Sequence, residues 1–429
     1  MNVVTPRKIL LSAYACEPGR GSEPGVGWHW MLALAGRPGV ELHVVTRANN
    51  RMAIEAYRSV HPETWCVHFH YYDLPRFFLW LKHHGLGTIA YHDLWQMGMV
   101  RLARRLHREH RFHLAHHLTF GQYRSATLLY RLGIPLFIGP LGGGERTPLN
   151  LLSLYTFRQR MEEYLRRFII KAAYVNPFLW RAYGKASLIF CRTDYTRQAL
   201  ILPSWRKKAL LATEIGANAD DIAAEPKAAR GKQFLFVGRY ISWKGIKLVL
   251  EAFRLLAGAE PDATLVMVGG GDMEDYMRRF VDENGLAGRV SIHTWMPQEE
   301  VQRHYGESRA MIFPSLHDSG GTVVLEALAH ATPVVCLDCA GPAVVVGADL
   351  QELVVPTKGR PPAEVAEALA AKLRMLCADE DKYQDLARRS LERARRMTWQ
   401  CRVEETYAEI EKSCSEEEKV EEKQEKDNF

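Results

Sequence analysis

The chain has few cysteines, no long apolar run and only a small excess of positive charge. Eight cysteines in 429 residues argue against a disulfide framework and favour a reducing compartment. No stretch approaches the roughly 20 apolar residues that span a bilayer, and the apolar start is interrupted too soon, by Glu17 and Pro18, for a signal peptide. The net charge of +6 is too small to predict a nucleic-acid partner, but it fits an anionic ligand or an acidic membrane surface. We expect a cytoplasmic protein.

One cysteine pair, Cys336-Leu-Asp-Cys339, has the spacing of a redox or zinc motif. A zinc site needs a second pair or nearby histidines, and none follows in the sequence. We therefore favour two small buried residues after a strand and keep redox or metal chemistry as the alternative.

Both halves of the chain repeat a short apolar strand, a glycine-containing turn and an amphipathic helix. In the first half we expect strands at 7–15, 40–48, 112–120 and 135–140, a loop at 18–27, and helices at 28–36 and 125–133. In the second half we expect strands at 233–240, 263–271, 289–296, 309–316 and 332–338, with helices at 244–258, 271–285, 298–309 and 321–331. Such regular alternation predicts an α/β protein with doubly wound parallel sheets.

The alanine-rich stretch between Ala217 and Lys232 contains Pro226 and no apolar period, so it predicts an interdomain linker. Two helices follow Arg360. The strongly charged end has almost no apolar content and predicts disorder. The resulting division is a first domain at 1–217, a linker at 218–231, a second domain at 232–394, a final helix at 395–413 and a disordered tail at 414–429.

Residues 151–210 break this regularity, because they are aromatic and basic with few acids. The simpler interpretation is a pair of solvated helices packed on the first domain. The functional interpretation is a surface for anionic lipid or for a lipid-linked acceptor.

The stretch HDSGGTVVLEALAHATPVV, residues 317–335, places two acids and two glycines around a predicted strand end and helix start. Ligands of doubly wound sheets bind at the carboxyl ends of the strands, and the first amides of a helix attract an anion. Gly320 and Gly321 allow a phosphate to approach the backbone. Asp318 and Glu326 are suited to accept hydrogen bonds from the hydroxyls of a sugar and a ribose. The pattern predicts a site for a sugar diphosphate.

Two cations follow the strand QFLFVGRY at its carboxyl end. Arg239 and Lys244 lie next to a predicted helix start, where both side-chain types commonly bind phosphate; exposed loop charges are the alternative. The glycine run 269–271 is a weak signal alone, because it lacks the register of a dinucleotide fingerprint.

Together these motifs resemble glycosyltransferase family 4, the retaining nucleotide-sugar transferases of the GT-B fold. The family's E-x7-E signature, in a context like PSxxEGFGLVxLEAMAxGxPVV, is similar to PSLHDSGGTVVLEALAHATPVV here, with FVGRYISWKG and LVMVGGGD upstream in the expected order. GRGSEPGVGW and HHLTFGQ resemble the first domain's glycine loop and histidine strand end. The resemblance implies two Rossmann-like domains facing each other across a cleft, with a C-terminal helix that crosses back to the first domain.

The resemblance also implies roles for individual residues. Arg239 and Lys244 would bind the diphosphate and stabilise the leaving group. Asp318 would bind the donor sugar, and Glu326 would bind the ribose. Either His116 or His117 would lie by the anomeric carbon. The remaining donor-side positions are Gly25, Gly238, Gly269, Gly270, Trp295, Met296, Gly320, Gly321 and Thr322, of which Trp295 and Met296 would hold the base through backbone groups.

The expected activity is transfer of a sugar from a nucleoside diphosphate sugar to a glycan or lipid-linked acceptor, with retention of anomeric configuration. No metal or other cofactor is expected, and peripheral contact with the inner face of an anionic membrane is a further expectation. One departure from the family pattern is Asp318 in place of glutamate, followed by Ser319-Gly320 where Gly-Phe is usual. The alternatives are a non-catalytic glycan- or partner-binding protein, and an epimerase or phosphorylase on the same architecture.

Overall fold

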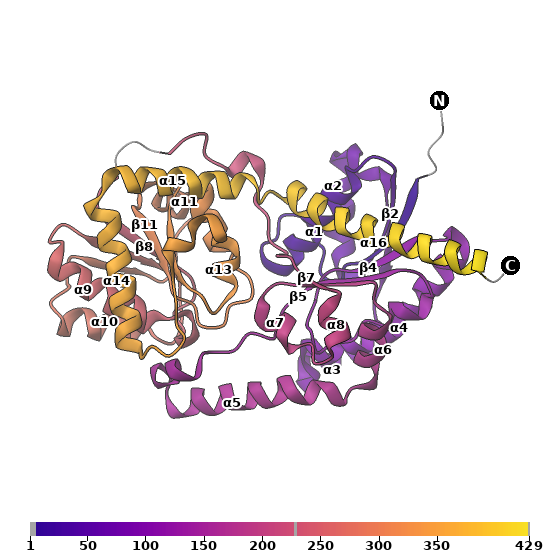
Figure 1. The fold of residues 1–429 in the computed structure, drawn as a ribbon, viewed down its shortest axis with the longest axis horizontal. Helices are drawn as coiled ribbons and strands as arrows, with labels where there is room; N and C mark the ends of the chain where they lie inside the picture. Colours follow the sequence, from indigo (N-terminus) through magenta and orange to yellow (C-terminus); the bar gives the residue numbers. More distant parts are fainter. Residues whose placement is uncertain (1–5, 227–229, 428–429) are drawn as a thin grey trace. The chain divides into compact units, whose positions relative to one another are not determined.

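The structure is a computed structural model that describes residues 6–226 and 230–427. Its contacts divide the chain into two units (Figure 1). Unit 1 comprises Met1–Gly144, Ile169–Glu214 and Trp399–Phe429, and unit 2 comprises Glu145–Phe168 and Ile215–Thr398.

Unit 1 is built on a seven-stranded parallel sheet with the strand order β3-β2-β1-β4-β5-β6-β7. The strands are β1 (Arg7–Ser12), β2 (Val40–Arg47), β3 (Val67–Tyr72), β4 (Leu114–His117), β5 (Leu136–Leu141), β6 (Leu188–Cys191) and β7 (Ala209–Leu211). The central strands β4 and β5 are buried along their whole length, as expected where helices cover both faces of a parallel sheet.

Helices flank this sheet (Figure 1). They are α1 (Ser22–Ala35), α2 (Arg51–Val60), α3 (Arg76–Leu81), α4 (Gly87–His110), α6 (Pro177–Lys185), α7 (Asp194–Ala199), α8 (Pro203–Lys207) and α16 (Trp399–Asp427). Helix α5 (Phe157–Ala172) contains the division between the units.

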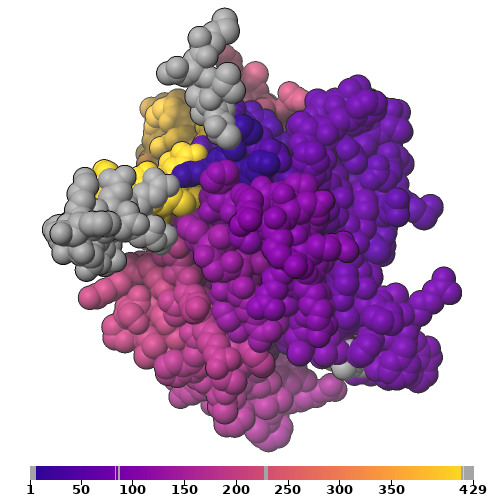
Figure 2. Space-filling view, turned by 90° about the vertical axis from the view of Figure 1, so that its right-hand side faces the viewer, coloured from indigo at the N-terminus to yellow at the C-terminus, as the bar shows by residue number. Residues whose placement is uncertain are grey.

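Strand alternation separates two apolar cores in unit 1. Leu10 packs in one core with Trp95 of α4, whereas Ile9 and Leu11 pack in the other with Tyr407 of α16. Figure 2 shows the same relationship, with yellow residues of the last helix against the indigo N-terminal strand. The predicted return of the C-terminal helix to the first domain is therefore confirmed.

Unit 2 contains a six-stranded parallel sheet with the order β10-β9-β8-β11-β12-β13. The strands are β8 (Gln233–Val237), β9 (Thr264–Val268), β10 (Val290–His293), β11 (Ala310–Phe313), β12 (Val334–Leu337) and β13 (Val354–Val355). The helices are α9 (Ile246–Ala259), α10 (Glu274–Glu283), α11 (Gln298–Glu307), α12 (Thr322–Ala329), α13 (Gly341–Val346), α14 (Pro362–Ala378) and α15 (Glu380–Arg395). The prediction of two doubly wound parallel sheets is confirmed.

Three predictions of local structure were wrong. Helix α1 begins at Ser22, inside the expected loop, because Gly25 and Gly27 let its backbone approach the carbonyl oxygens of Arg20 and Ala15. The expected helix at 125–133 is reduced to a 3₁₀ turn at Leu129–Leu132, since Leu128, Leu129 and Tyr130 are buried in succession rather than along one helical face.

The third difference concerns the charged tail. Helix α16 continues to Asp427, whereas the composition predicted disorder from residue 414. Glutamate, lysine and glutamine have high helix propensity, so a helix that starts on a buried apolar face can propagate into a polar segment. Residues 428–429 lie outside the described part of the chain.

The segment Glu145–Phe168 belongs to unit 2, whereas the sequence placed it in the first domain. The side-chain amide of Asn150 donates to the backbone oxygens of Thr357 and Arg360 at 2.8 and 2.6 Å. These contacts join segments about 200 residues apart, which no local sequence pattern indicates. In the expected linker, the amide of Ala223 donates to the oxygen of Ala329, and residues 227–229 lie outside the described part.

Candidate functional site

The predicted diphosphate-binding lysine and the first acid of the motif meet in unit 2. Strands β8 and β11 are neighbours in the sheet, so the segments that follow their carboxyl ends are adjacent. There the ammonium group of Lys244 forms an ion pair with the carboxylate of Asp318. The ammonium also lies 4.8 Å from the ring centre of Trp243 and 4.9 Å from that of Phe313. Cation–π contacts and the carboxylate therefore hold the lysine in one place.

Arg239 lies on the same strand end as Lys244. Its guanidinium carbon is 5.8 Å from the ring centre of Trp243, and its side chain is exposed. It borders a cavity of about 380 Å³ lined entirely by unit 2 residues: Tyr155, Gln159, Glu162, Glu163, Arg166, Arg239, Ile241, Ser242, Trp243, Asp272 and His317. A solvent-accessible guanidinium beside this cavity is free to bind an anion.

Glycine at the strand ends has a steric cause. A Cβ on Gly269 would lie 2.1 Å from the backbone oxygen of Gly238, and both residues have positive φ angles, +144° and +155°. Side chains at these positions would separate the ends of β8 and β9. Gly270 has more room, since its nearest neighbour, the oxygen of Thr294, would be 3.4 Å away.

The N-terminus of α12 follows directly from the loop that carries Asp318. Its N-cap Gly321 has φ +145° and makes no side-chain capping bond, while Thr322 is exposed. The amide of Gly341 donates to the oxygen of Asp318 at 2.6 Å. A Cβ on Gly341 would lie 2.3 Å from the oxygen of Gly320. The loop is therefore held closely, and the helix begins without a side chain over its first amides.

Glu326 lies one turn into α12 and is largely buried, with one carboxylate oxygen 2.9 Å from the hydroxyl of Tyr305, which donates to it. Burial raises the pKa of Glu326, and the charge of Asp221 raises it further, against the hydrogen bond from Tyr305. The tyrosine occupies one oxygen and leaves the other for a ligand.

The expected base-binding residues follow β10. The side chain of Trp295 is 77% exposed, and Met296 is partly buried. An indole of this exposure is unusual on a surface and offers a flat apolar face. Both residues follow the carboxyl end of β10, which is the neighbour of β9. They therefore lie at the same edge of the sheet as Gly269.

In unit 1, Gly25 lies in the first turn of α1, and a Cβ there would be 2.1 Å from the oxygen of Arg20. The neighbouring Glu23 accepts a hydrogen bond from the amide of Phe120 at 2.7 Å and lies 3.5 Å from Arg192. The glycine loop is thus joined to the segment after β4.

The two candidate histidines differ in their surroundings. His116 uses both ring nitrogens, Nδ1 with the hydroxyl of Tyr407 at 3.0 Å and Nε2 with the oxygen of Gly139 at 2.9 Å. His117 is the last residue of β4, and its Nδ1 lies 3.4 Å from the amide nitrogen of Gln96. Burial lowers the pKa of His116 to about 4 and that of His117 to about 3.

The amide oxygen of Gln96 is buried without a hydrogen-bond partner in the described part of the chain. An unsatisfied buried acceptor is costly and often marks a site that a ligand or water completes. The nitrogen of the same side-chain amide lies 3.4 Å from His117 Nδ1, whereas His116 has the pattern of a structural core residue.

Sequence reasoning missed the contribution of the segment at 145–168. Glu163 accepts from the amide of Thr147 at 3.0 Å, and Arg167 pairs with Glu163 at 3.4 Å. Burial raises the pKa of Glu163. These contacts position Glu163 and Arg166 at the cavity beside Arg239. Only the clustering of charge and aromatic residues in this stretch could have indicated it.

His317 was also missed, although it directly precedes Asp318. Its ring centre lies 4.6 Å from that of Trp243. Burial lowers the pKa of His317 to about 3, and the charges of Arg166 and Lys244 add to the effect. A neutral imidazole at the cavity is suited to a hydrogen bond rather than to an ion pair.

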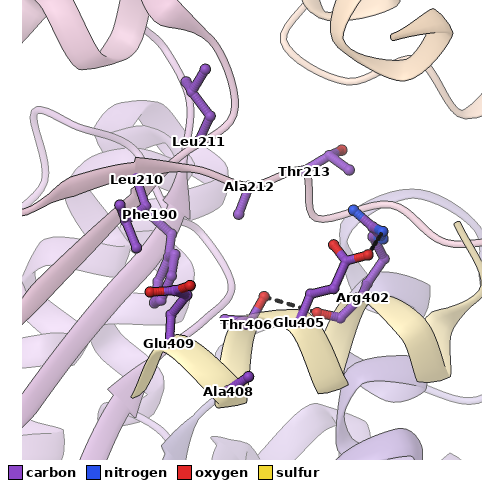
Figure 3. Close-up of a pocket in the computed structure, with 10 residues that line it drawn as sticks. All are labelled: Phe190, Leu210, Leu211, Ala212, Thr213, Arg402, Glu405, Thr406, Ala408 and Glu409. Carbon is purple, nitrogen blue, oxygen red and sulfur yellow. Dashed lines mark hydrogen bonds and ion pairs between the residues drawn. The ribbon is translucent and has the colours of Figure 1, made fainter. Parts of the chain in front are cut away.

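A second cavity, of about 490 Å³, lies in unit 1 between the strands β6 and β7 and helix α16 (Figure 3). Its polar lining includes Arg402, Glu405 and Glu409, and Arg402 pairs with Glu405. It contains none of the predicted site residues. The pair Cys336 and Cys339 is buried, and burial raises the pKa of both thiols, which agrees with the structural interpretation of the CxxC spacing.

No helix within residues 6–226 and 230–427 has both the length and the apolar character needed to cross a bilayer.

Comparisons with known proteins show which family and which fold the chain resembles. Residues 218–393 match the family model described as glycosyl transferases group 1. An uncharacterized glycosyltransferase of Methanocaldococcus jannaschii is 30% identical over 138 residues, which are 32% of this chain and 33% of that protein. The lipopolysaccharide core biosynthesis glycosyltransferase LpsE of Rhizobium meliloti is 22% identical over 283 residues, 64% of this chain and 79% of that protein. The chain thus aligns with about a third of the first relative.

Solved structures share the fold over nearly the whole chain. HepE of Anabaena, in complex with UDP and glucose, superposes with a TM-score of 0.55 at 15% identity and covers 95% of this chain and 100% of that one. The lipopolysaccharide outer core galactosyltransferase WaaB superposes with a TM-score of 0.60 at 12% identity, covering 94% and 99%. At these identities the likeness establishes the GT-B fold alone.

Proposed function

We propose that this chain, whose residues 218–393 match the family model of group 1 glycosyl transferases, transfers a sugar from a nucleoside diphosphate sugar to a glycan or lipid-linked acceptor. The observation that carries the proposal is the cluster of Lys244, Asp318 and Arg239 at the carboxyl ends of β8 and β11, next to the uncapped start of α12. Ligands of open α/β sheets bind at this edge. Binding of UDP by the Anabaena structure supports a uridine nucleotide as the first donor to test.

Lys244 and Arg239 would neutralise the diphosphate as the bond to the sugar breaks. Preorganised cations and amides stabilise developing charge without reorganising at the moment of reaction, which is usually the largest catalytic term. The first amides of α12, at Gly321 and Thr322, point from a helix N-terminus and would add to this stabilisation.

Asp318 and Glu326 would bind the two sugars of the donor, the transferred sugar and the ribose. The carboxylate of Asp318 is positioned by Lys244 and would accept a hydrogen bond from a hydroxyl of the transferred sugar. Glu326 has one oxygen engaged by Tyr305 and would use the other for the ribose. Trp295 and Met296 would contact the base. In unit 1, we favour His117 over His116 as the ligand-binding histidine, because His116 has no free ring nitrogen.

We further propose retention of configuration and turnover without a metal ion. The motif around Asp318 and Glu326 resembles that of retaining transferases, and two cations with the helix amides supply the positive charge that a metal would otherwise bring. Analysis of the product's anomeric proton coupling by NMR tests retention, and an inverted product would contradict it. Turnover that disappears with EDTA and returns with Mg²⁺ would contradict metal independence.

An acceptor on a membrane is supported by helix α5. Five large side chains recur on one helical face and are exposed between 49% and 75%: Phe157, Met161, Tyr164, Leu165 and Phe168. Arginines flank this stripe, among them Arg158 and Arg160. An exposed apolar stripe with basic neighbours fits the interface of an anionic bilayer, and we propose peripheral contact there.

The decisive experiment measures thermal unfolding of the full chain with UDP, GDP, ADP and their sugar conjugates, followed by product analysis with the stabilising donor. We expect one nucleotide at about 100 times its dissociation constant to stabilise the protein by roughly 2.7 kcal/mol, and we expect this effect to be weakened in Glu326→Ala. Stabilisation without a glycosylated product would favour a binding protein, and an isomerised sugar would favour an epimerase. The absence of stabilisation by every nucleotide would contradict the proposal.

A further inference from the structure

Four histidines gather in unit 1, on elements that the proposed function does not use. His43 lies on β2, His68 and His70 lie on β3, and His110 ends helix α4. In the parallel register His43 is opposite His68. Since side chains of a strand alternate between faces, Glu41 and His43 lie on the same face of the sheet as His68 and His70.

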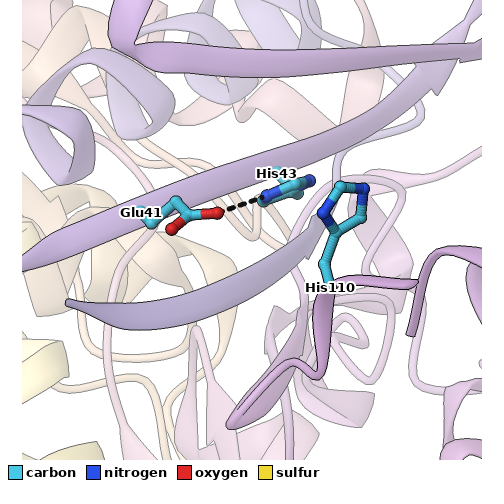
Figure 4. A group of neighbouring side chains, drawn as sticks. All are labelled: Glu41, His43 and His110. Atoms are coloured by element: carbon cyan, nitrogen blue, oxygen red, sulfur yellow. Dashed lines mark hydrogen bonds and ion pairs between the residues drawn. The ribbon is translucent and has the colours of Figure 1, made fainter. Parts of the chain in front are cut away.

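Two of these histidines, His43 and His110, have potential metal-ligand atoms close to the carboxylate of Glu41. His43 Nε2 lies 3.1 Å from Glu41 Oε1, and one ligand atom each of Glu41, His43 and His110 lie within 4.8 Å of one another. Figure 4 shows the ring of His110, the last residue of α4, close to the two side chains of β2. Ligands at 2.0–2.1 Å from a tetrahedral zinc ion are themselves about 3.3 Å apart, so small rotations would bring the three into a coordination shell.

A neighbouring histidine fixes the orientation of the central ligand. His43 Nδ1 lies 3.0 Å from His70 Nε2. When His43 Nδ1–H donates to His70, the lone pair of His43 is on Nε2, the atom that faces Glu41. Metal-bound histidines characteristically make such a hydrogen bond through the other ring nitrogen.

The electrostatics keep the ligands in the forms that bind a metal. Burial lowers the pKa of His43, and the nearby His68 and His110 lower it further, against the hydrogen bond to Glu41. Burial also lowers the pKa of His70 to about 4. Burial alone would raise the pKa of Glu41, but hydrogen bonds with His43 and Lys8 outweigh it and lower that pKa. These shifts favour a neutral imidazole at His43 and a carboxylate at Glu41, the forms that metal binding requires.

We propose that Glu41, His43 and His110 bind a divalent transition-metal ion, for which zinc is the best match, and that His70 orients His43. Two imidazoles and one carboxylate form a ligand set that suits zinc, whereas calcium and magnesium prefer oxygen ligands throughout. Binding of the metal breaks the hydrogen bond between Glu41 and His43, and the proton of the His43 ring moves from Nε2 to Nδ1. The fourth position is open to water.

The position of the site gives it a structural role. Glu41 and His43 lie near the amino end of β2, and α4 ends at His110 just before β4. Ligands of open α/β sheets bind at the opposite, carboxyl ends of the strands. A metal here would join β2 to the end of α4 and stabilise unit 1. Lys8, which lies 3.5 Å from Glu41 and is partly exposed, would move aside. The inference does not depend on the proposed function.

Titration of the metal-free full chain with Zn²⁺ by calorimetry, and with Co²⁺ by absorption spectroscopy, tests the site. Cys66 has an exposed thiol, and thiolates are zinc ligands, so every protein in the titration carries Cys66→Ser. We expect one ion per chain and the visible bands of tetrahedral Co²⁺. His43→Gln and His110→Gln should each weaken binding at least tenfold, and His70→Gln, which removes only the orienting hydrogen bond, by about tenfold.

His61→Gln is the matched control, because His61 and Glu63 form a comparable pair at 3.0 Å elsewhere in unit 1; it should leave the affinity unchanged. His110 is less buried than His43, so its variant remains informative if His43→Gln misfolds by circular dichroism. Equal affinity in the parent, His110→Gln and His61→Gln proteins would overturn the proposal, as would Co²⁺ spectra without tetrahedral bands.

Discussion

In unit 2, the ammonium group of Lys244 is paired with the carboxylate of Asp318, 74 positions further along the chain. Their side chains are 13% and 18% exposed, so each charge depends on the other for much of its stabilisation when no ligand is bound. A diphosphate that enters beside Lys244 would share the lysine with Asp318 and release that carboxylate toward a sugar hydroxyl. The pair therefore couples the expected phosphate site to the expected sugar site.

Lys244→Ala should lower kcat by about 100- to 1000-fold, because it removes a preorganised charge at the leaving group. Steady-state rates with the donor found by thermal unfolding measure this effect. Lys232→Ala is the matched control, since Lys232 pairs with Glu260 at 2.7 Å in the same unit but lies before the amino end of β8, away from the carboxyl ends of the strands. Activity of Lys244→Ala within a few-fold of the control would show that the lysine is not catalytic.

Asp318→Glu should change the preferred donor sugar while leaving the affinity for the free nucleoside diphosphate within about threefold. The added methylene moves the carboxylate relative to the sugar but keeps the charge that pairs with Lys244. Competition between sugar conjugates of one nucleotide, expressed as ratios of kcat/KM, measures the change. A parallel loss of nucleotide affinity would instead place Asp318 at the diphosphate.

Tyr305→Phe should move the pH dependence of nucleotide binding upward. Burial already raises the pKa of Glu326, and the hydrogen bond from Tyr305 opposes that shift. Since the carboxylate accepts from the ribose, affinity should increase as pH rises through this pKa and then level off. Without the tyrosine hydroxyl the pKa rises further, so the plateau begins at higher pH. Dissociation constants between pH 4.5 and 8 test this, with Tyr276→Phe as the control; superimposable profiles would contradict it.

Acid should destabilise unit 1 through His116. Its pKa is about 4 when folded and 6.5 in the unfolded chain, so the unfolded state binds the extra proton between these values. Stability is complete above pH 6.5 and falls by about 3 kcal/mol as pH decreases to 4, at 1.36 kcal/mol per unit. Urea unfolding of the parent and of His116→Gln measures the slope, which should be shallower by about one proton in the variant. An equal slope in the parent and in His116→Gln would refute this assignment.

The double variant Phe157→Ser, Leu165→Ser should bind anionic vesicles at least tenfold more weakly than the parent. Burial of these side chains in the interface supplies the apolar part of the membrane affinity. Cosedimentation with phosphatidylglycerol vesicles, and with phosphatidylcholine vesicles for comparison, measures the change. Met52→Ser removes an apolar side chain of still higher exposure from α2 and serves as the control. Parent protein that binds neither type of vesicle would remove the membrane proposal.

The sequence alone was enough to predict the architecture and to single out candidate residues for a donor site. The apolar strands β8, β9 and β11 are short and local, and glycine directly follows β8 and β9, so the type and order of these elements could be predicted from the sequence. The spacing of Asp318 and Glu326 around Gly321 is likewise local, and α12 begins where the motif predicted. Arg239 and Lys244 follow a recognisable strand end.

Only the tertiary structure decided which of these groups meet and which are already engaged. Lys244 contacts Asp318 because β8 and β11 are neighbours in the sheet. The pairing of these two strands depends on crossover connections. Asn150 attaches its segment to unit 2 through backbone oxygens, which leave no trace in residue types. Both ring nitrogens of His116 have hydrogen-bond partners, whereas the adjacent His117 lies beside the side-chain amide of Gln96, whose oxygen has none in the described part of the chain. Local propensity determines the elements, whereas long-range packing determines the partners of each polar atom.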